Sequence, residues 1–553
     1  MIFEILDVDA LGRIGKLTVN NKEMVTPNLF PVVHPLKNVI PPFELKRFGA
    51  QGIFTNAYIT FQSKELRENI IKRGIHSYLK FNGLIATDSG AFQQYMYNNN
   101  RFDINAEEIE RFQEDINSDF PVILDIPVQL DDTHEIAKKK VFSTIERAKD
   151  NIKRRTNENC HWFGPIHGGK YLDLLNLSVS EMNKLDYDIY AIGGLVKAFI
   201  DYRFDLTLQI LLTVKKSLIP NKPIHMFGLG LPQFFSLAVA CGCDLMDSAA
   251  YILFAKQNRY FTLSTGTKTL DELKEFPCHC PICCEYSPTE IKKLDNKVCI
   301  ELLAKHNLYL SFSELRTIRQ AIREGNLWEL VEQRIRSHPY LVNAFKVLTK
   351  YLDSFESQEK LYKNHGRLFG SSQSIYRPLI HRYISKIIKN YRVPENVKYL
   401  VILPELDVKG ASSLTIQMWL NEINNNSLVL RESLHVVFIS VFFGFIPLGL
   451  SNSFPMGQYE SINVIKNYDL LYNESIKKAQ IFINHFSKLY ERCGVLIPKK
   501  YINQFGENTD FPKNNPIHGL DLILNSKFKS NYLKSDNITE ILQFFIKNDL
   551  YTS

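Results

Sequence analysis

The densest group of chemically reactive side chains is the segment FPCHCPICC, residues 276–284. Cys278, Cys280 and Cys283 follow the spacing C-x-C-x-x-C in a chain that contains nine cysteines. Three thiolates at this spacing can converge on one tetrahedral ion, which favours zinc. The segment therefore predicts a structural zinc site. Reduced loop cysteines without a metal and a redox-active C-x-x-C pair are the alternatives.

The spacing leaves the fourth ligand open. His306 opens a helix-like stretch about two dozen residues further on, and it is the nearest candidate for completing a Cys3His site. Cys284, Cys299 and His279 are its rivals. An ion with four protein ligands has no open position for an activated water, so we expect one Zn2+ with a structural role.

A second group of polar residues follows short apolar segments between residues 40 and 250. Asp88, Asp125 and Asp247 each stand at the end of such a segment. Other residues at such ends are His167, Gly193 and Gly194. If the segments are parallel strands of one barrel, their carboxyl ends meet at one mouth. Carboxylates gathered there cost desolvation and mutual repulsion unless a ligand or solvent receives them, so a catalytic site is expected.

The same region alternates apolar segments with stretches of helical periodicity, as parallel strands joined by crossover helices do. The strand candidates are GIFTNAY, GLIATDSG, FPVILDIP, HWFGPIHGG, IYAIGGL, PIHMFGLG and DLMDSAA. The segment NLFPVVHPL would supply an eighth strand. We therefore expect an α/β fold, a (β/α)8 TIM barrel, with a doubly wound open sheet as the alternative.

Length and composition bound the class of protein. With 553 residues, 45% of them hydrophobic, the chain can form about two to four domains with sizeable cores. No signal peptide is visible and the cysteines are clustered, so we expect a soluble, cytoplasmic protein. The stretch LHVVFISVFFGFIPLGL is interrupted by His435, Gly444 and Pro447, which predicts a buried strand and a loop. The net charge of +7 is compatible with nucleic-acid binding but is no evidence for it.

Several motifs resemble those of the archaeal-type tRNA-guanine transglycosylases. They are ATDSGAFQ, IYAIGGL, MFGLG and GCDLMDSAAY, together with the cysteine cluster and the later HNL. The resemblance covers about residues 1 to 345 and ends near RSHPYLVNAF. One DSG triplet would mean little, but several motifs in the family's order make the match specific.

The resemblance implies a base exchange at an N-glycosidic bond by double displacement, much as in retaining glycosidases. Asp247 would be the nucleophile that holds the ribose covalently while one base leaves and another enters. Asp88 would be the general acid/base. For Asp244, on the same segment as Asp247, a structural or supporting role is expected.

The resemblance also implies how the base is held. Phe92 and Phe227 would stack on its two faces, unless they are barrel core. Asp125 would accept from the ring N–H and the exocyclic amine, unless it caps a turn. The backbone of Gly193 and Gly194 would reach the carbonyl side.

One position departs from the family pattern. His167 stands where the family usually has glutamine before the glycine pair. A histidine can still donate one hydrogen bond to a purine carbonyl, with a different reach and with titration near neutral pH. His167 is therefore expected to bind the base, while the preferred base is left open.

The resemblance implies a barrel catalytic domain over residues 1–345, with an inserted zinc subdomain at about 270–345 that shapes an RNA-facing or dimer surface. Composition indicates a linker over 346–370, an α/β accessory domain over 371–500 and a tail over 501–553. The tail lacks the β pattern of the RNA-binding PUA module of many relatives, so a separate PUA-bearing protein could supply tRNA contacts.

In such relatives, guanine 15 of the tRNA D-loop is exchanged for 7-cyano-7-deazaguanine (preQ0) on the way to archaeosine. The buried guanine must be flipped out of the RNA to react. The implied partners are tRNA, guanine and preQ0. The oligomeric state is left open, although relatives dimerise through the zinc region and a homodimer would be compatible with the resemblance. An archaeosine-synthase-like paralogue and a non-catalytic tRNA-binding subunit are the alternatives; the first would need a P-C-S-K-like motif that we do not find, and the two aspartates count against the second.

Overall fold

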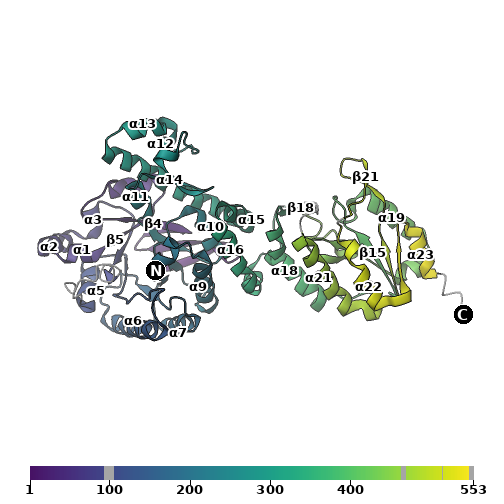
Figure 1. Ribbon diagram of the computed structural model, residues 1–553. Helices are drawn as coiled ribbons and strands as arrows, with labels where there is room; N and C mark the ends of the chain where they lie inside the picture. Colours follow the sequence, from purple (N-terminus) through teal and green to yellow (C-terminus); the bar gives the residue numbers. More distant parts are fainter. Residues whose placement is uncertain (92–104, 366, 462–468, 514, 547–553) are drawn as a thin grey trace. The chain divides into compact units, whose positions relative to one another are not determined.

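The computed structural model describes residues 1–91, 105–365, 367–461, 469–513 and 515–546. The chain divides into two compact units, Met1–Lys360 and Leu361–Ser553 (Figure 1). The first unit contains the motifs that carry the family resemblance, and the second unit has its own sheet and core.

Unit 1 begins with a three-stranded antiparallel sheet in the order β1-β2-β3. Its strands are β1 (Ile2–Asp9), β2 (Gly12–Val19) and β3 (Lys22–Thr26). Leu17, Val19 and Met24 of this sheet belong to the same apolar cluster as Phe30 and Phe120 of the following strands. The small sheet therefore shares its core with the main sheet.

The main sheet of unit 1 has eight strands in the order β7-β6-β5-β4-β11-β10-β9-β8, and neighbouring strands are parallel. A parallel bridge between Val122 and Phe163 joins its two edges, so the sheet is a nearly closed barrel. This confirms the predicted TIM-like barrel over the open sheet, with NLFPVV as its first strand. The strands are β4 (Asn28–Val33), β5 (Gly52–Asn56), β6 (Leu84–Asp88), β7 (Phe120–Pro121), β8 (Phe163–Ile166), β9 (Ile189–Ile192), β10 (Ile224–Met226) and β11 (Leu245–Ser248).

Helices connect the barrel strands and surround them (Figure 1). The long helix α6 (His134–Arg154) illustrates why: Thr133 caps its first turn, and Ala137, Val141, Ile145 and Ala148 recur at helical spacing on its buried face. The others are α1 (Ala57–Phe61), α2 (Lys64–Arg73), α3 (Ile75–Leu79), α5 (Ala106–Asp115), α7 (Leu172–Met182), α8 (Val196–Ile200), α9 (Phe204–Ser217), α10 (Pro232–Ala240) and α11 (Ala250–Ala255).

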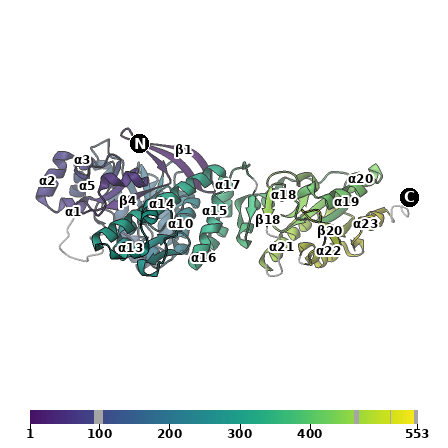
Figure 2. The same cartoon turned by 90° about the horizontal axis from the view of Figure 1, so that it is seen from above.

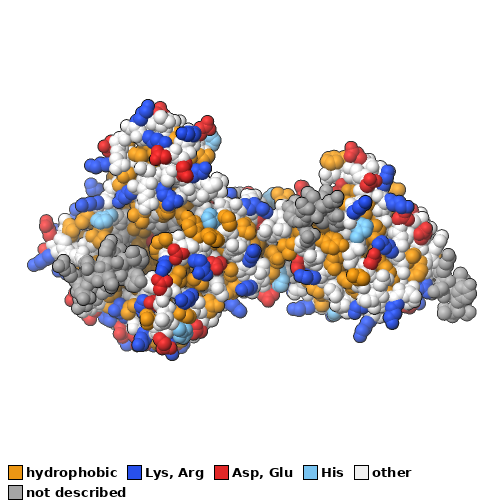
Figure 3. Space-filling model, in the orientation of Figure 1, with side chains coloured by type: hydrophobic (Ala, Val, Ile, Leu, Met, Phe, Trp, Pro, Cys, Tyr) orange, Lys and Arg blue, Asp and Glu red, His pale blue; other side chains and the backbone are white. Residues whose placement is uncertain are grey.

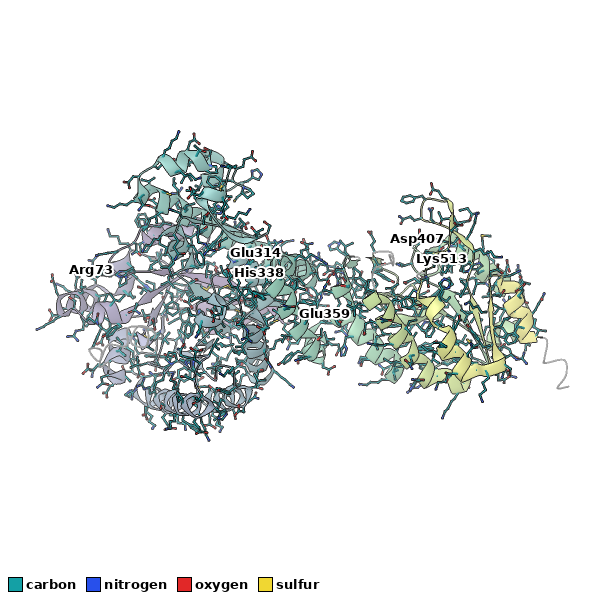
Figure 4. The ribbon with its side chains drawn as sticks, viewed as in Figure 1. Arg73, Glu314, His338, Glu359, Asp407 and Lys513 are labelled. Atoms are coloured by element: carbon teal, nitrogen blue, oxygen red, sulfur yellow. The ribbon has the colours of Figure 1, made fainter. Side chains whose placement is uncertain are left out.

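After the barrel, unit 1 adds a hairpin and a group of helices. Helix α14 spans 29 residues and is followed by Gly325, whose positive φ of 72° suits glycine at the end of a helix. Its buried Glu314 pairs with Arg334 of α15 at 2.8 Å, and His338, at the start of α16, stacks on Tyr202. Glu314 and His338 are labelled in Figure 4. The elements are β12 (Arg259–Thr262), β13 (Gly266–Thr269), α12 (Pro281–Glu285), α13 (Pro288–Lys293), α14 (Asn296–Glu324), α15 (Leu327–Arg334), α16 (Pro339–Leu348) and α17 (Leu352–Gln358).

Unit 2 is built on a five-stranded sheet in the order β17-β16-β15-β19-β22, in which only β17 is antiparallel to its neighbour. Its strands are β15 (Tyr399–Pro404), β16 (Leu434–Ser440), β17 (Gly444–Pro447), β19 (Arg492–Leu496) and β22 (Tyr532–Ser535). The stretch expected to be a buried strand and a loop forms the β16–β17 hairpin, with both strands buried. Residues beyond 500 add β22 to the same sheet, because its side chains complete the apolar core beside β19.

Helices pack around this sheet, and α19 and α23 lie side by side (Figures 1 and 2). Within the described ranges, no helix is long and apolar enough to cross a membrane. The helices are α18 (Pro378–Asn390), α19 (Leu414–Asn424), α20 (Leu428–Ser433), α21 (Asp469–Phe486), α22 (Asp521–Phe528) and α23 (Ile538–Ile546). Short strands complete the unit: β14 (Arg367–Phe369), β18 (Tyr459–Ser461), β20 (Lys500–Ile502) and β21 (Asn508–Asp510).

Candidate active site

A cavity of about 450 Å3 opens at the carboxyl ends of the barrel strands. The strands contribute side chains from positions far apart in sequence, which meet here because parallel strands share one end of the barrel. Seven residues predicted from the sequence line the cavity: Asp88, Asp125, His167, Gly193, Gly194, Phe227 and Asp247. The eighth, Phe92, lies outside the described residues.

Asp88 is the last residue of β6, and Asn56 stands beside it in register at the end of β5. The Asn56 side-chain amide donates to Asp88 Oδ2 at 3.0 Å, and the backbone N–H of Gly90 donates to Oδ1 at 3.2 Å. Burial raises the pKa of Asp88 from its usual 3.8 to about 7, and the nearby charges of Asp125 and Asp247 add to the rise. Asp88 can therefore gain or lose a proton near neutral pH.

Asp247 lies on β11, and its carboxylate is anchored on one side only. Within the part of the chain that the structure describes, its hydrogen bonds both end on Oδ1, from His225 Nε2 at 2.8 Å and from the Gly228 N–H at 3.2 Å. The side chain is 13% exposed. Neither of these two hydrogen bonds involves the second oxygen, Oδ2, and Asp247 lines the cavity.

Asp125 is paired with the histidine that departs from the family pattern. His167 Nε2 lies 2.6 Å from Asp125 Oδ2, and their side chains are only 1% and 9% exposed. His167 Nδ1 has no hydrogen-bond partner among the described residues. Gly193 lies so close to the His167 ring that an added Cβ would overlap it. The ring is thus held between Asp125 and Gly193, with Nε2 directed to the carboxylate.

Phe227 both lines the cavity and packs against the barrel core. Its ring contacts those of Phe54 and Phe163, at centroid distances of 6.1 and 5.9 Å. The two predictions for Phe227, a residue of the barrel core and a stacking surface for the base, are therefore compatible. A partly buried phenylalanine at the edge of the cavity offers a flat apolar surface for a base.

Two contact residues were missed in the sequence. Asn56 holds Asp88, and His225 holds Asp247. His225 is the one polar residue of β10, and Asn56 is the polar residue that ends β5, and these positions are signals that could have identified them. Asp244, by contrast, is fully buried and receives two hydrogen bonds from Arg13, at 2.7 and 2.8 Å. Its role is structural, because it neutralises a buried guanidinium.

A Cys3His cluster lies in the segment that follows the barrel. Cys278, Cys280, Cys283 and His306 each offer one ligand atom, and these atoms lie within 4.8 Å of one another. Cys280 Sγ and Cys283 Sγ lie 3.5 and 3.4 Å from His306 Nδ1. A tetrahedral zinc site requires separations of about 3.6 Å between sulfur and nitrogen. The four residues can therefore hold a metal ion.

The surroundings of His306 also suit a metal ligand. His306 Nε2 lies 3.0 Å from the carbonyl oxygen of Phe261, which leaves Nδ1 to face the sulfurs. Tyr260 stacks on the imidazole at 3.6 Å. The rival residues lie elsewhere: His279 and Cys284 are exposed, and Cys299 contacts Asn258.

The surface carries charges of both signs. Figure 3 shows lysine, arginine and acidic side chains mixed over the visible face of unit 1, without a separate basic face. This distribution agrees with the modest net charge of +7. The surface charge alone therefore does not identify a ligand.

Comparison with known proteins connects the chain to a family. A family model described as queuine tRNA-ribosyltransferase matches residues 8–340. A tRNA-guanine(15) transglycosylase of Methanocaldococcus jannaschii is 39% identical over 519 residues, which are 92% of this chain and 76% of the relative. Proteins of the same name from Methanococcus maripaludis and Methanococcus aeolicus are 37% and 35% identical, over 93% and 100% of this chain and 77% and 82% of the relatives.

Proposed function

We propose that Asp247 and Asp88 carry out base exchange by double displacement. The premise is that this chain belongs to the queuine tRNA-ribosyltransferase family. The activity itself is that of a tRNA-guanine(15) transglycosylase. The observation that supports our assignment of roles is the meeting of Asp88, Asp125 and Asp247 in one cavity at the barrel mouth. Each carboxylate has a different environment, which suits different duties.

In the first half-reaction, Asp247 Oδ2 attacks the ribose C1′ of the target guanosine. The C1′–O bond forms as the C1′–N9 bond breaks, and guanine leaves with the electron pair. Protonated Asp88 supplies a proton to the departing base, which its pKa of about 7 permits at neutral pH. The RNA backbone stays intact because the ribose is held as an ester of Asp247.

In the second half-reaction, the incoming base occupies the same cavity. Asp88, now ionised, removes a proton from that base, whose nitrogen attacks C1′ and releases Asp247. We propose 7-cyano-7-deazaguanine (preQ0) as the incoming base. Asp88 then ends protonated, ready for the next cycle.

Recognition of the base rests on the rest of the cavity. Phe227 and Phe92 would stack on the base, and the backbone of Gly193 and Gly194 would reach its carbonyl side. Asp125 Oδ1 would accept hydrogen bonds from the base N–H groups. His167 would support this contact by holding Asp125 Oδ2, to which its Nε2 is directed at 2.6 Å.

We propose Zn2+ as the ion of the Cys3His cluster. Three sulfurs and one imidazole nitrogen form a closed tetrahedral set, and this set leaves no open position for catalysis. The ion would stabilise the segment between β12 and α14. A structural role follows, with no step of the exchange passing through the metal.

The substrate is tRNA, and further partners are proposals. A separate PUA-bearing protein could add tRNA contacts, and the chain could form a homodimer. A cytoplasmic location accords with tRNA as substrate. The alternatives of an archaeosine-synthase-like paralogue and of a non-catalytic subunit are disfavoured, because both carboxylates needed for exchange face one cavity.

The test is incubation of the protein with a tRNA transcript and radioactive guanine. Wild-type protein should incorporate the label and form a protein–RNA adduct that survives denaturation. Asp247→Asn should lose both, because an amide oxygen is a poor nucleophile. Incorporation at the wild-type rate by this variant would refute Asp247 as the nucleophile.

A further inference from the structure

His225 occupies the centre of the barrel directly below the cavity. It lies on β10 and is fully buried. Its ring is surrounded by the rings of Phe30, Phe54, Phe163 and Phe227, at centroid distances of 6.0, 6.0, 5.1 and 5.0 Å. A polar side chain in such an apolar cage is costly unless its polar atoms have partners.

Among the described residues, the one hydrogen-bond partner of the His225 ring is Asp247. His225 Nε2 lies 2.8 Å from Asp247 Oδ1, whereas His225 Nδ1 has no hydrogen-bond partner there. A proton on Nδ1 would be a buried donor without an acceptor, so the contacts favour the tautomer with its proton on Nε2. In that tautomer, the imidazole donates to the carboxylate.

We propose that His225 is a positioning residue for Asp247, an inference that rests on the proposed role of Asp247 as nucleophile. The imidazole N–H and the Gly228 N–H together fix Oδ1, so the carboxylate cannot rotate and Oδ2 faces the ribose. After attack, Oδ1 is the ester carbonyl oxygen and still accepts both bonds. When the incoming base displaces the ester, the same donors stabilise the charge that returns to the carboxylate.

The second histidine of the site repeats this arrangement. His167 is also almost fully buried, its Nε2 contacts a carboxylate oxygen of Asp125, and its Nδ1 lacks a partner among the described residues. Two of the three carboxylates in the cavity are thus held by a buried histidine through the same ring nitrogen. This repetition supports the view that His167 and His225 orient the carboxylates and do not merely fill space.

The experiment compares His225→Leu with His225→Gln in the full-length protein. Leucine suits the apolar cage but donates no hydrogen bond, whereas glutamine can present a donor close to the position of Nε2. For His225→Leu, we expect kcat and the single-turnover rate of adduct formation to fall about 10- to 100-fold, because the nucleophile loses its orientation. KM for tRNA should stay within about twofold, since His225 is fully buried and not exposed to a bound RNA.

His225→Gln should recover a clear part of the lost rate. If leucine leaves kcat and the adduct rate unchanged, the proposal is wrong. Equal losses in both variants, matched by equal falls in melting temperature, would assign His225 a merely structural role and also overturn it. Asp247→Asn distinguishes failure of the proposed nucleophile from failure of the positioning role. Base exchange by Asp247→Asn would refute Asp247 as the nucleophile. An inactive Asp247→Asn together with a fully active His225→Leu would refute only the positioning role of His225.

Discussion

Asn56 and Asp88 end two neighbouring strands in register, and the Asn56 amide donates a hydrogen bond of 3.0 Å to Asp88 Oδ2. This bond favours the ionised carboxylate, whereas burial and the charges of Asp125 and Asp247 favour the protonated acid. The balance gives a pKa of about 7. Both protonation states are then populated near neutral pH, as a residue that acts first as acid and then as base requires.

The two half-reactions should respond to pH in opposite directions. Formation of the adduct needs protonated Asp88, whose fraction falls above its pKa, so the rate should drop about tenfold per pH unit above about pH 7. Discharge of the adduct by the incoming base needs the carboxylate and should slow as the pH falls below that value. Rapid quenching followed by denaturing electrophoresis measures both rates.

Asn56→Ala is the matched variant for this prediction. It removes a bond that favours the charged form, so the pKa of Asp88 should rise and both pH profiles should move to higher pH. Rates that stay constant across neutral pH would show that Asp88 is not the group whose proton moves.

The pairing of His167 with Asp125 predicts an effect on base binding. His167→Leu leaves the Asp125 carboxylate buried without its partner, so KM for guanine should rise about 10-fold or more. The effect on kcat should be smaller, because in the proposed mechanism Asp125 neither forms the covalent bond to the ribose nor transfers the proton. Steady-state assays at varied guanine concentration measure this separation.

His167→Gln provides the control, since a glutamine amide can also donate to Asp125. It should keep KM closer to the wild-type value than leucine does. Unchanged guanine affinity in the leucine variant would contradict a role of the pair in binding the base.

The metal site predicts a loss of stability without a loss of chemistry. Purified protein should contain about one equivalent of zinc, and Cys280→Ser should lower the metal content and the melting temperature. The intrinsic rate of exchange in the folded protein should change less. Metal analysis and thermal unfolding, combined with the guanine assay, measure the three quantities.

Cys284→Ser is the control for the metal site, because Cys284 is an exposed neighbour outside the cluster. It should leave the metal content unchanged. A metal content of wild-type protein below about half an equivalent would show that the cluster does not hold a resident ion.

The sequence by itself predicted a barrel for the first unit, three cysteines of the Cys3His cluster, and three aspartates at one barrel mouth. Cys278, Cys280 and Cys283 are close in space because the chain between them is too short to separate them. Asp88, Asp125 and Asp247 could be assigned to one mouth, because strands of a parallel barrel end on the same side wherever they lie in the sequence. The spacing of the cysteines was sufficient for the first inference, and the periodicity and ends of the apolar segments were sufficient for the second.

Only the tertiary structure decided which atoms meet. The neighbours of Asp88, Asp125 and Asp247 are Asn56, His167 and His225, each from another strand, and strand order and register bring them within about 3 Å. Periodicity does not report register, so His225 looked like one more residue of a buried strand. In the second unit, the sequence did not predict β22. A short strand far along the chain gains its stability from the neighbouring strand, and the sequence pattern does not show that pairing.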